Sequence, residues 1–179
     1  MIKANPSGDC PNIHSSSYVD ETAVLIGNVK IGENVFIGPG AIIRADEKNS
    51  EIVIKDCCNV QDRVIIHCLE ETKVIVHANT SLAHGCIIHG PSEIGDNSFI
   101  GFNSVVFGAT LGEGVIVKHQ CCVEGVTIPS SRMIESGQIL KYQNETNDLK
   151  NVNYESTQFA EKVVNVNLDL VKGYATNAL

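Results

Sequence analysis

The sequence of 179 residues contains no apolar stretch long enough to cross a membrane and no cluster of positive charge. A membrane-spanning helix needs about 18 or more consecutive apolar residues, and the opening residues Met1-Ile2-Lys3 are not typical of a signal peptide. The 13 Lys and Arg residues are outnumbered by 21 Asp and Glu residues, which gives a net charge of -8. Because that charge repels phosphate groups, nucleic acid and anionic membranes are poor partners. We therefore expect a cytoplasmic protein that binds neither of them.

A disulfide framework is also missing from the cysteine pattern. The chain has 7 cysteines, an odd number, and two pairs of them are adjacent: Cys57-Cys58 and Cys121-Cys122. Neighbouring residues of an extended chain point to opposite sides, so these pairs favour reduced thiols. The 6 histidines have no evident role from composition alone, and their positions in the fold must decide it.

Helical periodicity is absent between residues 13 and 137, and an aliphatic residue recurs at every sixth position instead. The period is interrupted by a five-residue insertion after Ile43, a four-residue insertion after Ile66 and one dropped residue after Val106. The first run of these residues comprises Ile13, Val19, Leu25, Ile31, Ile37 and Ile43. The position four residues after each aliphatic is small or branched, and Cys58, Cys86 and Cys121 occupy it. This hexapeptide repeat predicts an all-β, left-handed parallel β-helix, in which three hexads form each triangular coil and both positions point into the core. The three cysteines are then core residues.

The repeat ends after Gly137, and we expect three regions along the chain. Residues 1–140 form the β-helix domain, and the polar, Asn-rich residues 141–155 form a linker. Residues 156–179 form a C-terminal helix and tail, because an apolar stripe from Phe159 to Tyr174 has helical spacing. We expect this helix to pack on the outside of the prism, with a strand at residues 163–166 as the alternative.

The repeat register gives three of the histidines definite places. His67 and His89 each follow an aliphatic residue, Ile66 and Ile88, and these two are separated by three hexads and a four-residue insertion, so the histidines stack in one column roughly 5 Å apart. Arg44 lies one coil below them in the same column. His84 belongs to a second column, with Asp62 one coil below it. About 15 Å of extended chain separates His84 from His89, so one chain cannot bring all three imidazoles to one ion.

A threefold assembly of prisms would complete that set. The His84 corner of one subunit would lie against the His67 and His89 corner of the next, and Asp62 would approach Arg44 in an interface ion pair. Three neutral imidazoles with an open fourth position are the ligands of a catalytic zinc site, whose bound water has a pKa of about 7. The alternative is that the histidines stack without a function.

The segments that contain these residues resemble the γ-class carbonic anhydrases. They are Arg44-Ala45-Asp46-Glu47, residues 59–67 (NVQDRVIIH) and residues 81–91 (SLAHGCIIHGP). The resemblance covers about residues 10–140 and is closest to an archaeal and bacterial branch with a short acidic loop. It implies a homotrimeric lyase that hydrates carbon dioxide reversibly to bicarbonate through a metal-bound hydroxide. Zinc is the usual metal, and iron(II) or cobalt can substitute.

The resemblance also assigns roles to individual residues. It implies His67, His84 and His89 as metal ligands. Gln61 would hold the metal-bound water, and Glu47 would move a proton or orient the hydroxide, although a plain corner amide and a solvated loop carboxylate remain the alternatives. The remaining implied residues are Asn59 and Asn167 near bicarbonate, Arg44 and Asp62 as the interface ion pair, and Glu70 in proton export.

Two departures from the family pattern bear on activity. The loop after His67 is short, from Cys68 to Lys73, so Glu70 does not have the reach of the proton-exporting glutamate, and a weak or buffer-dependent rate follows. Asn165 stands where other members carry a tyrosine, which affects the expected orientation of bicarbonate. Two alternative functions stay open: a hexapeptide acyltransferase, and a metal-binding scaffold subunit without turnover.

Overall fold

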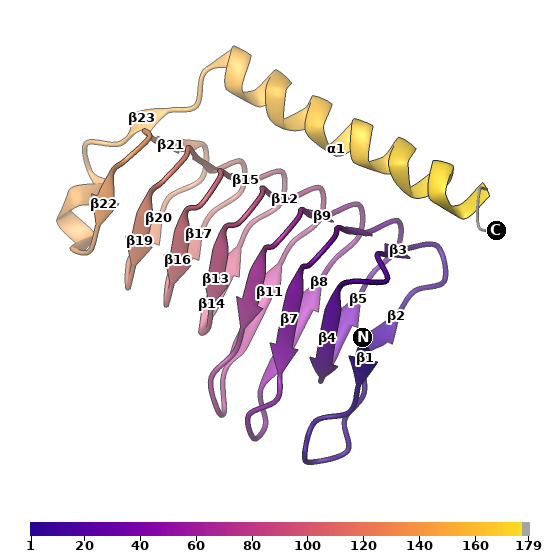
Figure 1. Cartoon of the computed structure of the whole chain (residues 1–179). Helices are drawn as coiled ribbons and strands as arrows, with labels where there is room; N and C mark the ends of the chain where they lie inside the picture. Colours follow the sequence, from indigo (N-terminus) through magenta and orange to yellow (C-terminus); the bar gives the residue numbers. More distant parts are fainter. Residues whose placement is uncertain (177–179) are drawn as a thin grey trace.

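The computed structural model describes residues 1–176, which form a left-handed parallel β-helix with a long helix along one side (Figure 1). The first of its three sheets contains β1 (Ile2–Lys3), β4 (Val24–Gly27), β7 (Ile42–Ala45), β10 (Ile65–His67), β13 (Ile87–His89), β16 (Val105–Phe107), β19 (Cys122–Glu124) and β22 (Ile139–Leu140). The second contains β2 (Asn12–Ile13), β5 (Val29–Ile31), β8 (Glu51–Ile54), β11 (Lys73–Val76), β14 (Ser92–Ile94), β17 (Thr110–Leu111) and β20 (Thr127–Ile128). The third contains β3 (Tyr18–Val19), β6 (Phe36–Ile37), β9 (Asn59–Val60), β12 (Ser81–Leu82), β15 (Phe99–Ile100), β18 (Ile116–Val117), β21 (Arg132–Ile134) and β23 (Lys150–Asn151).

The register of the strands follows the hexad of the sequence. Ile66 of β10 pairs in parallel with Ile43 of β7 and with Ile88 of β13, and all three side chains are fully buried. Complete burial of such a side chain stabilises the fold by roughly 1.5–3 kcal/mol relative to exposure. Cys58 and Cys86 are free thiols buried in the same core, so the predicted fold class and the core role of these cysteines are confirmed.

Close contact between coils restricts some positions to glycine. Gly27 has a φ of +83°, and a Cβ atom there would lie 1.9 Å from the carbonyl oxygen of Ala45. Neither the backbone angle nor the space admits another side chain without movement of the next coil. This glycine lets the chain turn where β4 passes directly below β7.

The segment expected as a linker contains two short elements on the C-terminal end of the prism. The 3₁₀-helix η1 spans Gln143–Thr146, and β23 pairs antiparallel with β21. Thr146 and Leu149 are buried, and Leu149 joins the main core. The segment therefore covers apolar side chains of the last coil, a role that its polar composition conceals.

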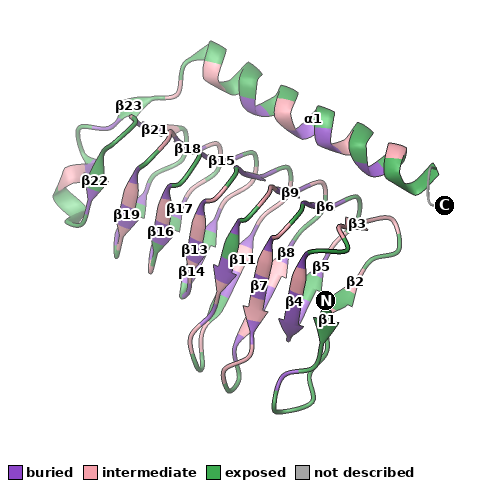
Figure 2. Ribbon diagram, viewed as in Figure 1, coloured by how far each residue is buried: buried purple, intermediate pink, exposed green. Residues whose placement is uncertain are grey.

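The helix α1 (Tyr154–Thr176) lies lengthwise over the third sheet (Figures 1 and 2). Its buried residues, Ala160, Val164, Asn167 and Val171, recur at helical spacing. The Asn153 carboxamide accepts a hydrogen bond from the Ser156 amide at 2.9 Å, as expected of a residue that caps a helix N-terminus. Residues 163–166 are helical, so the alternative strand is not formed. Within residues 1–176, no helix has the length and apolar character needed to span a membrane.

Candidate metal centre

Two predicted ligands meet on the first sheet. His67 at the end of β10 is in register with His89 at the end of β13, and Arg44 of β7 is in register with His67. His67 Nδ1 lies 3.1 Å from His89 Nε2. Two imidazole nitrogens bound to one tetrahedral ion at about 2.0–2.1 Å would be about 3.3 Å apart. The pair therefore fits two ligands of a single zinc-sized ion.

The surroundings of His67 favour the neutral imidazole. Burial lowers the pKa of His67 below its ordinary value, and the neighbouring Arg44 and His89 side chains lower it further. The carboxylates of Asp46 and Glu47 oppose that shift without reversing it. Because only the neutral ring can donate a lone pair to a metal, a lowered pKa extends the pH range in which the site is competent.

His84 lies on a different corner of the prism, in the turn that follows β12. Its side chain is half exposed, its Nδ1 is 3.4 Å from Asp62 Oδ2, and its ring is 5.3 Å from the ring of Phe102. In the described part of this single chain, no three His, Cys, Asp or Glu side chains are placed to hold an ion together. The fold thus provides a two-histidine corner and a one-histidine corner.

Glu47 and Glu70 are joined through the backbone. Glu47 Oε2 accepts a hydrogen bond from the backbone N–H of Glu70 at 2.7 Å, and its Oε1 lies 3.5 Å from His67 Nε2. The Glu70 side chain is exposed. The short loop after His67 therefore acts on Glu47 through a main-chain donor, and it directs the Glu47 carboxylate toward the candidate ligand.

The predicted amides form a network that ties α1 to the solenoid. Gln61 Nε2 donates to Asn59 Oδ1 at 3.0 Å and to Asn167 Oδ1 at 2.7 Å. Asn59 is fully buried on β9, where its Nδ2 donates to Ser81 Oγ at 2.7 Å. A groove of about 330 Å³ adjoins this network, and its polar lining residues are Gln61, Asn167, His84 and Lys162. The rest of its lining is apolar and comes from α1, from β15 and from the turns after β12 and β15. The amides of Gln61 and Asn167 thus line the same, mostly apolar groove as His84.

Arg44 and Asp62 have partners within the chain. Arg44 Nη1 donates to Asp46 Oδ2 at 2.9 Å, and Asp62 faces His84. Their pairing across a subunit interface stays a prediction. Asp46, which contacts Arg44 and approaches His67, is not among the site residues predicted from the sequence. The spacing of the sequence could have identified it, because Asp46 follows Arg44 by two positions and so lies on the same side of the extended chain.

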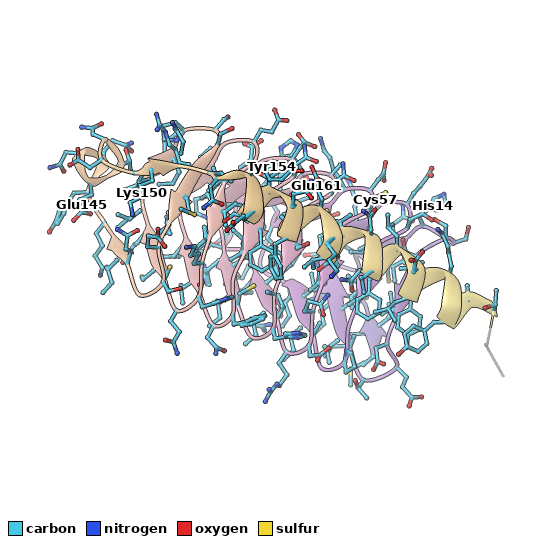
Figure 3. All side chains as sticks on the ribbon, turned by 90° about the horizontal axis from the view of Figure 1, so that it is seen from above. His14, Cys57, Glu145, Lys150, Tyr154 and Glu161 are labelled. Atoms are coloured by element: carbon cyan, nitrogen blue, oxygen red, sulfur yellow. The ribbon has the colours of Figure 1, made fainter. Side chains whose placement is uncertain are left out.

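Asn165 lies away from the amide network. It is exposed and lines a second groove with Asn79, Asn97 and Glu161, whereas Asn167 faces Gln61. In the view from above, Glu161 and Cys57 lie on the same side of the helix (Figure 3). Residues two apart on a helix differ by about 200° in direction, so Asn165 and Asn167 point to different flanks. Within the chain, Asn167 rather than Asn165 therefore contacts Gln61, and the bearing of position 165 on the orientation of bicarbonate stays a prediction.

Comparisons with known proteins give the chain a family. The family described as "Bacterial transferase hexapeptide (six repeats)" matches residues 11–45 and 73–108. The carbonic anhydrase of Methanosarcina thermophila is 36% identical over 191 residues, which cover 95% of this chain and 77% of the relative. The carboxysome assembly protein CcmM of a Nostoc species is 40% identical over 172 residues, and the chain spans only 31% of that longer protein.

Solved structures agree on the fold. A hexapeptide transferase family protein from Anaplasma phagocytophilum superimposes with a TM-score of 0.83 over 97% of this chain and 98% of the other, at 23% identity. A likeness at that identity concerns the fold alone. With the sequence relatives, it leads to one conclusion: the chain belongs to the hexapeptide-repeat family and, within it, to the γ-class carbonic anhydrase-like proteins.

Proposed function

We propose that this protein is a metal-dependent carbonic anhydrase that interconverts carbon dioxide and bicarbonate at the interfaces of a homotrimer. The observation that carries the proposal is the 3.1 Å approach of His67 Nδ1 to His89 Nε2 on one corner, with His84 on another. Three histidines from two subunits would then hold a metal ion with one position left open, and zinc bound there would supply hydroxide near neutral pH. The carbonic anhydrase of Methanosarcina thermophila, at 36% identity, supports the same reaction.

The chain's own groups then have distinct tasks. Glu47, fixed by the Glu70 N–H and partly exposed, takes up a proton close to His67 and passes it to solvent. Gln61, fixed by Asn59 and Asn167, presents its amide beside His84, where it orients the polar product. The apolar wall of the adjoining groove suits the uncharged substrate. Because the loop after His67 is short and Glu70 meets Glu47 through its backbone N–H, we expect no relay through the Glu70 carboxylate, so the transfer from Glu47 to solvent should depend on added buffer.

Complementation between variants tests the shared site. His84→Ala and His67→Ala should each abolish metal binding and hydration in a homotrimer, since each removes one side of every interface. Mixed trimers assembled at random from equal amounts would have about one quarter of their interfaces intact, and should regain about that fraction of activity. His119→Ala, in the same corner column as His84, is the matched control. Metal binding by the His84→Ala protein alone, or no recovery on mixing, contradicts the proposal.

Stopped-flow hydration also separates the alternative functions. The anaerobically prepared protein, loaded with zinc or iron(II), is assayed in concentrated imidazole buffer. Stoichiometric metal with acceleration supports the enzyme. Metal without acceleration supports a scaffold subunit, a function suggested by the relative named as a carboxysome assembly protein. Absence of both would leave the hexapeptide acyltransferase. Reduced thiols at all seven cysteines are consistent with the cytoplasmic location that we expect.

A further inference from the structure

Asp46 holds a carboxylate oxygen that lacks a partner. Among residues 1–176, its Oδ1 is the one buried side-chain nitrogen or oxygen with no hydrogen bond. The other oxygen, Oδ2, accepts from Arg44 Nη1 at 2.9 Å. Leaving a buried acceptor unpaired is unfavourable, so a nearby donor is expected to satisfy it.

The side chain of His67 brings a ring nitrogen close to this oxygen. Its Nε2 lies 3.5 Å from Asp46 Oδ1, slightly beyond an ordinary hydrogen bond, while its Nδ1 faces His89. Glu47 Oε1 lies at the same 3.5 Å distance from Nε2. However, Glu47 already accepts the Glu70 N–H, and its side chain is 39% exposed against 23% for Asp46. Water can complete the hydrogen bonding of Glu47, whereas the buried oxygen of Asp46 depends on His67.

We propose that Asp46 is a positioning residue that accepts a hydrogen bond from protonated Nε2 of His67 and so directs the Nδ1 lone pair toward His89. The proposal rests on the metal site of the proposed function. Histidines that bind metals nearly always donate their other ring N–H to a carboxylate or carbonyl, which sets the tautomer and the ring orientation. Arg44 holds the Asp46 carboxylate in place. Glu47 is thereby left available for proton transfer.

Two variants and a control test this role. Asp46→Ala removes the acceptor, and Asp46→Asn retains an oxygen at the same position. Asp56→Asn changes a corner carboxylate that accepts from the Glu33 N–H and is the matched control. Zinc affinity is measured by chelator competition, and the tautomer of His67 is read from long-range ¹H–¹⁵N NMR spectra of histidine-labelled protein, with and without zinc. Circular dichroism establishes that each variant is folded.

The wild-type protein should show His67 protonated at Nε2. We expect Asp46→Ala to bind zinc 10- to 100-fold more weakly than the wild type and to show a mixture of His67 tautomers. Asp46→Asn should keep most of the zinc affinity and mainly the Nε2–H tautomer. Asp56→Asn should match the wild type in both measurements. Wild-type affinity and tautomer in Asp46→Ala would overturn the proposal, as would a wild-type His67 protonated at Nδ1. If Asp46→Ala does not fold, the metal-free spectrum of the wild-type protein decides, because protonation of His67 at Nδ1 rather than Nε2 overturns the role. A wild-type protein that binds no zinc defeats the proposed function, yet the metal-free spectrum still tests Asp46.

Discussion

The hydrogen bond between Gln61 and Asn167 should couple the C-terminal helix to the candidate site. Asn167 is buried, accepts from Gln61 Nε2 at 2.7 Å and donates to the Val163 carbonyl at 2.8 Å. An intramolecular hydrogen bond contributes about 0.5–1.5 kcal/mol net. In Asn167→Ala, Gln61 keeps its bond to Asn59, so the added cost of an unpaired donor is small. Alanine also improves helix propensity by about 0.5 kcal/mol, which offsets part of the loss.

A double-mutant cycle removes that offset. Gln61→Ala, Asn167→Ala and the double variant are unfolded in urea at one protein concentration, with circular dichroism as the readout. We expect a coupling free energy of about 1 kcal/mol between the two positions. Asn165→Ala is the matched control, since it brings the same gain in propensity on the exposed flank of the helix and should stabilise slightly. Additive effects within about 0.3–0.5 kcal/mol would refute the reasoning.

Three further outcomes follow from the structure. Burial raises the pKa of the Cys58 thiol to about 12, whereas Cys10 is exposed. Iodoacetamide at pH 8 should therefore alkylate Cys10 within minutes and Cys58 only when the protein unfolds. Rapid labelling of Cys58 in the native protein would contradict this. The ammonium groups of two lysines, 2.5 and 2.6 Å away, hold the pKa of Glu51 below its ordinary value. The stabilisation from ionised Glu51 is therefore fully present above its unfolded pKa of about 4.3 and is lost as pH falls through its lower folded pKa. Glu51→Gln should reduce the change in the urea unfolding midpoint between pH 7 and pH 3. The same pH dependence in the variant as in the wild type would count against the ion pairs. Gly27→Ala should lower the free energy of unfolding, measured by thermal unfolding, by more than about 2 kcal/mol, because the new Cβ would meet the next coil. Gly8→Ala has open space around it and should cost only about 1–2 kcal/mol, for its positive φ. Equal losses in the two variants would show that the contact between coils is unimportant.

The repeat made much of this structure predictable. The aliphatic residue of each hexad points inward, so the repeat determines which side chains are buried. The strand pairing then follows, since residues three hexads apart, with any inserted residues added, lie in register. That arithmetic predicts the pairing of His67 with His89 and of Arg44 with His67, both of which the structure contains. Parallel strands repeat at a constant spacing, so a residue number converts directly into a position on the prism.

Contacts outside the repeat were less predictable. The cover over the last coil depends on Thr146 and Leu149, two buried residues within a polar segment. The flank on which Asn165 lies depends on how α1 rotates against the third sheet, and that rotation is decided by the packing of Ala160 and its neighbours. No periodicity in the strands specifies either contact.

The sequence by itself determined the β-helix, the position of the core and the columns in which His67, His84 and His89 lie, because a short repeat converts directly into geometry. Tertiary structure alone decided the orientation of the side chains within those columns. It placed the Glu70 N–H against Glu47 and the unpaired oxygen of Asp46 toward His67. These contacts join loops of adjacent coils more than twenty residues apart, and their hydrogen bonds depend on rotamers and burial that exist only once the coils have stacked.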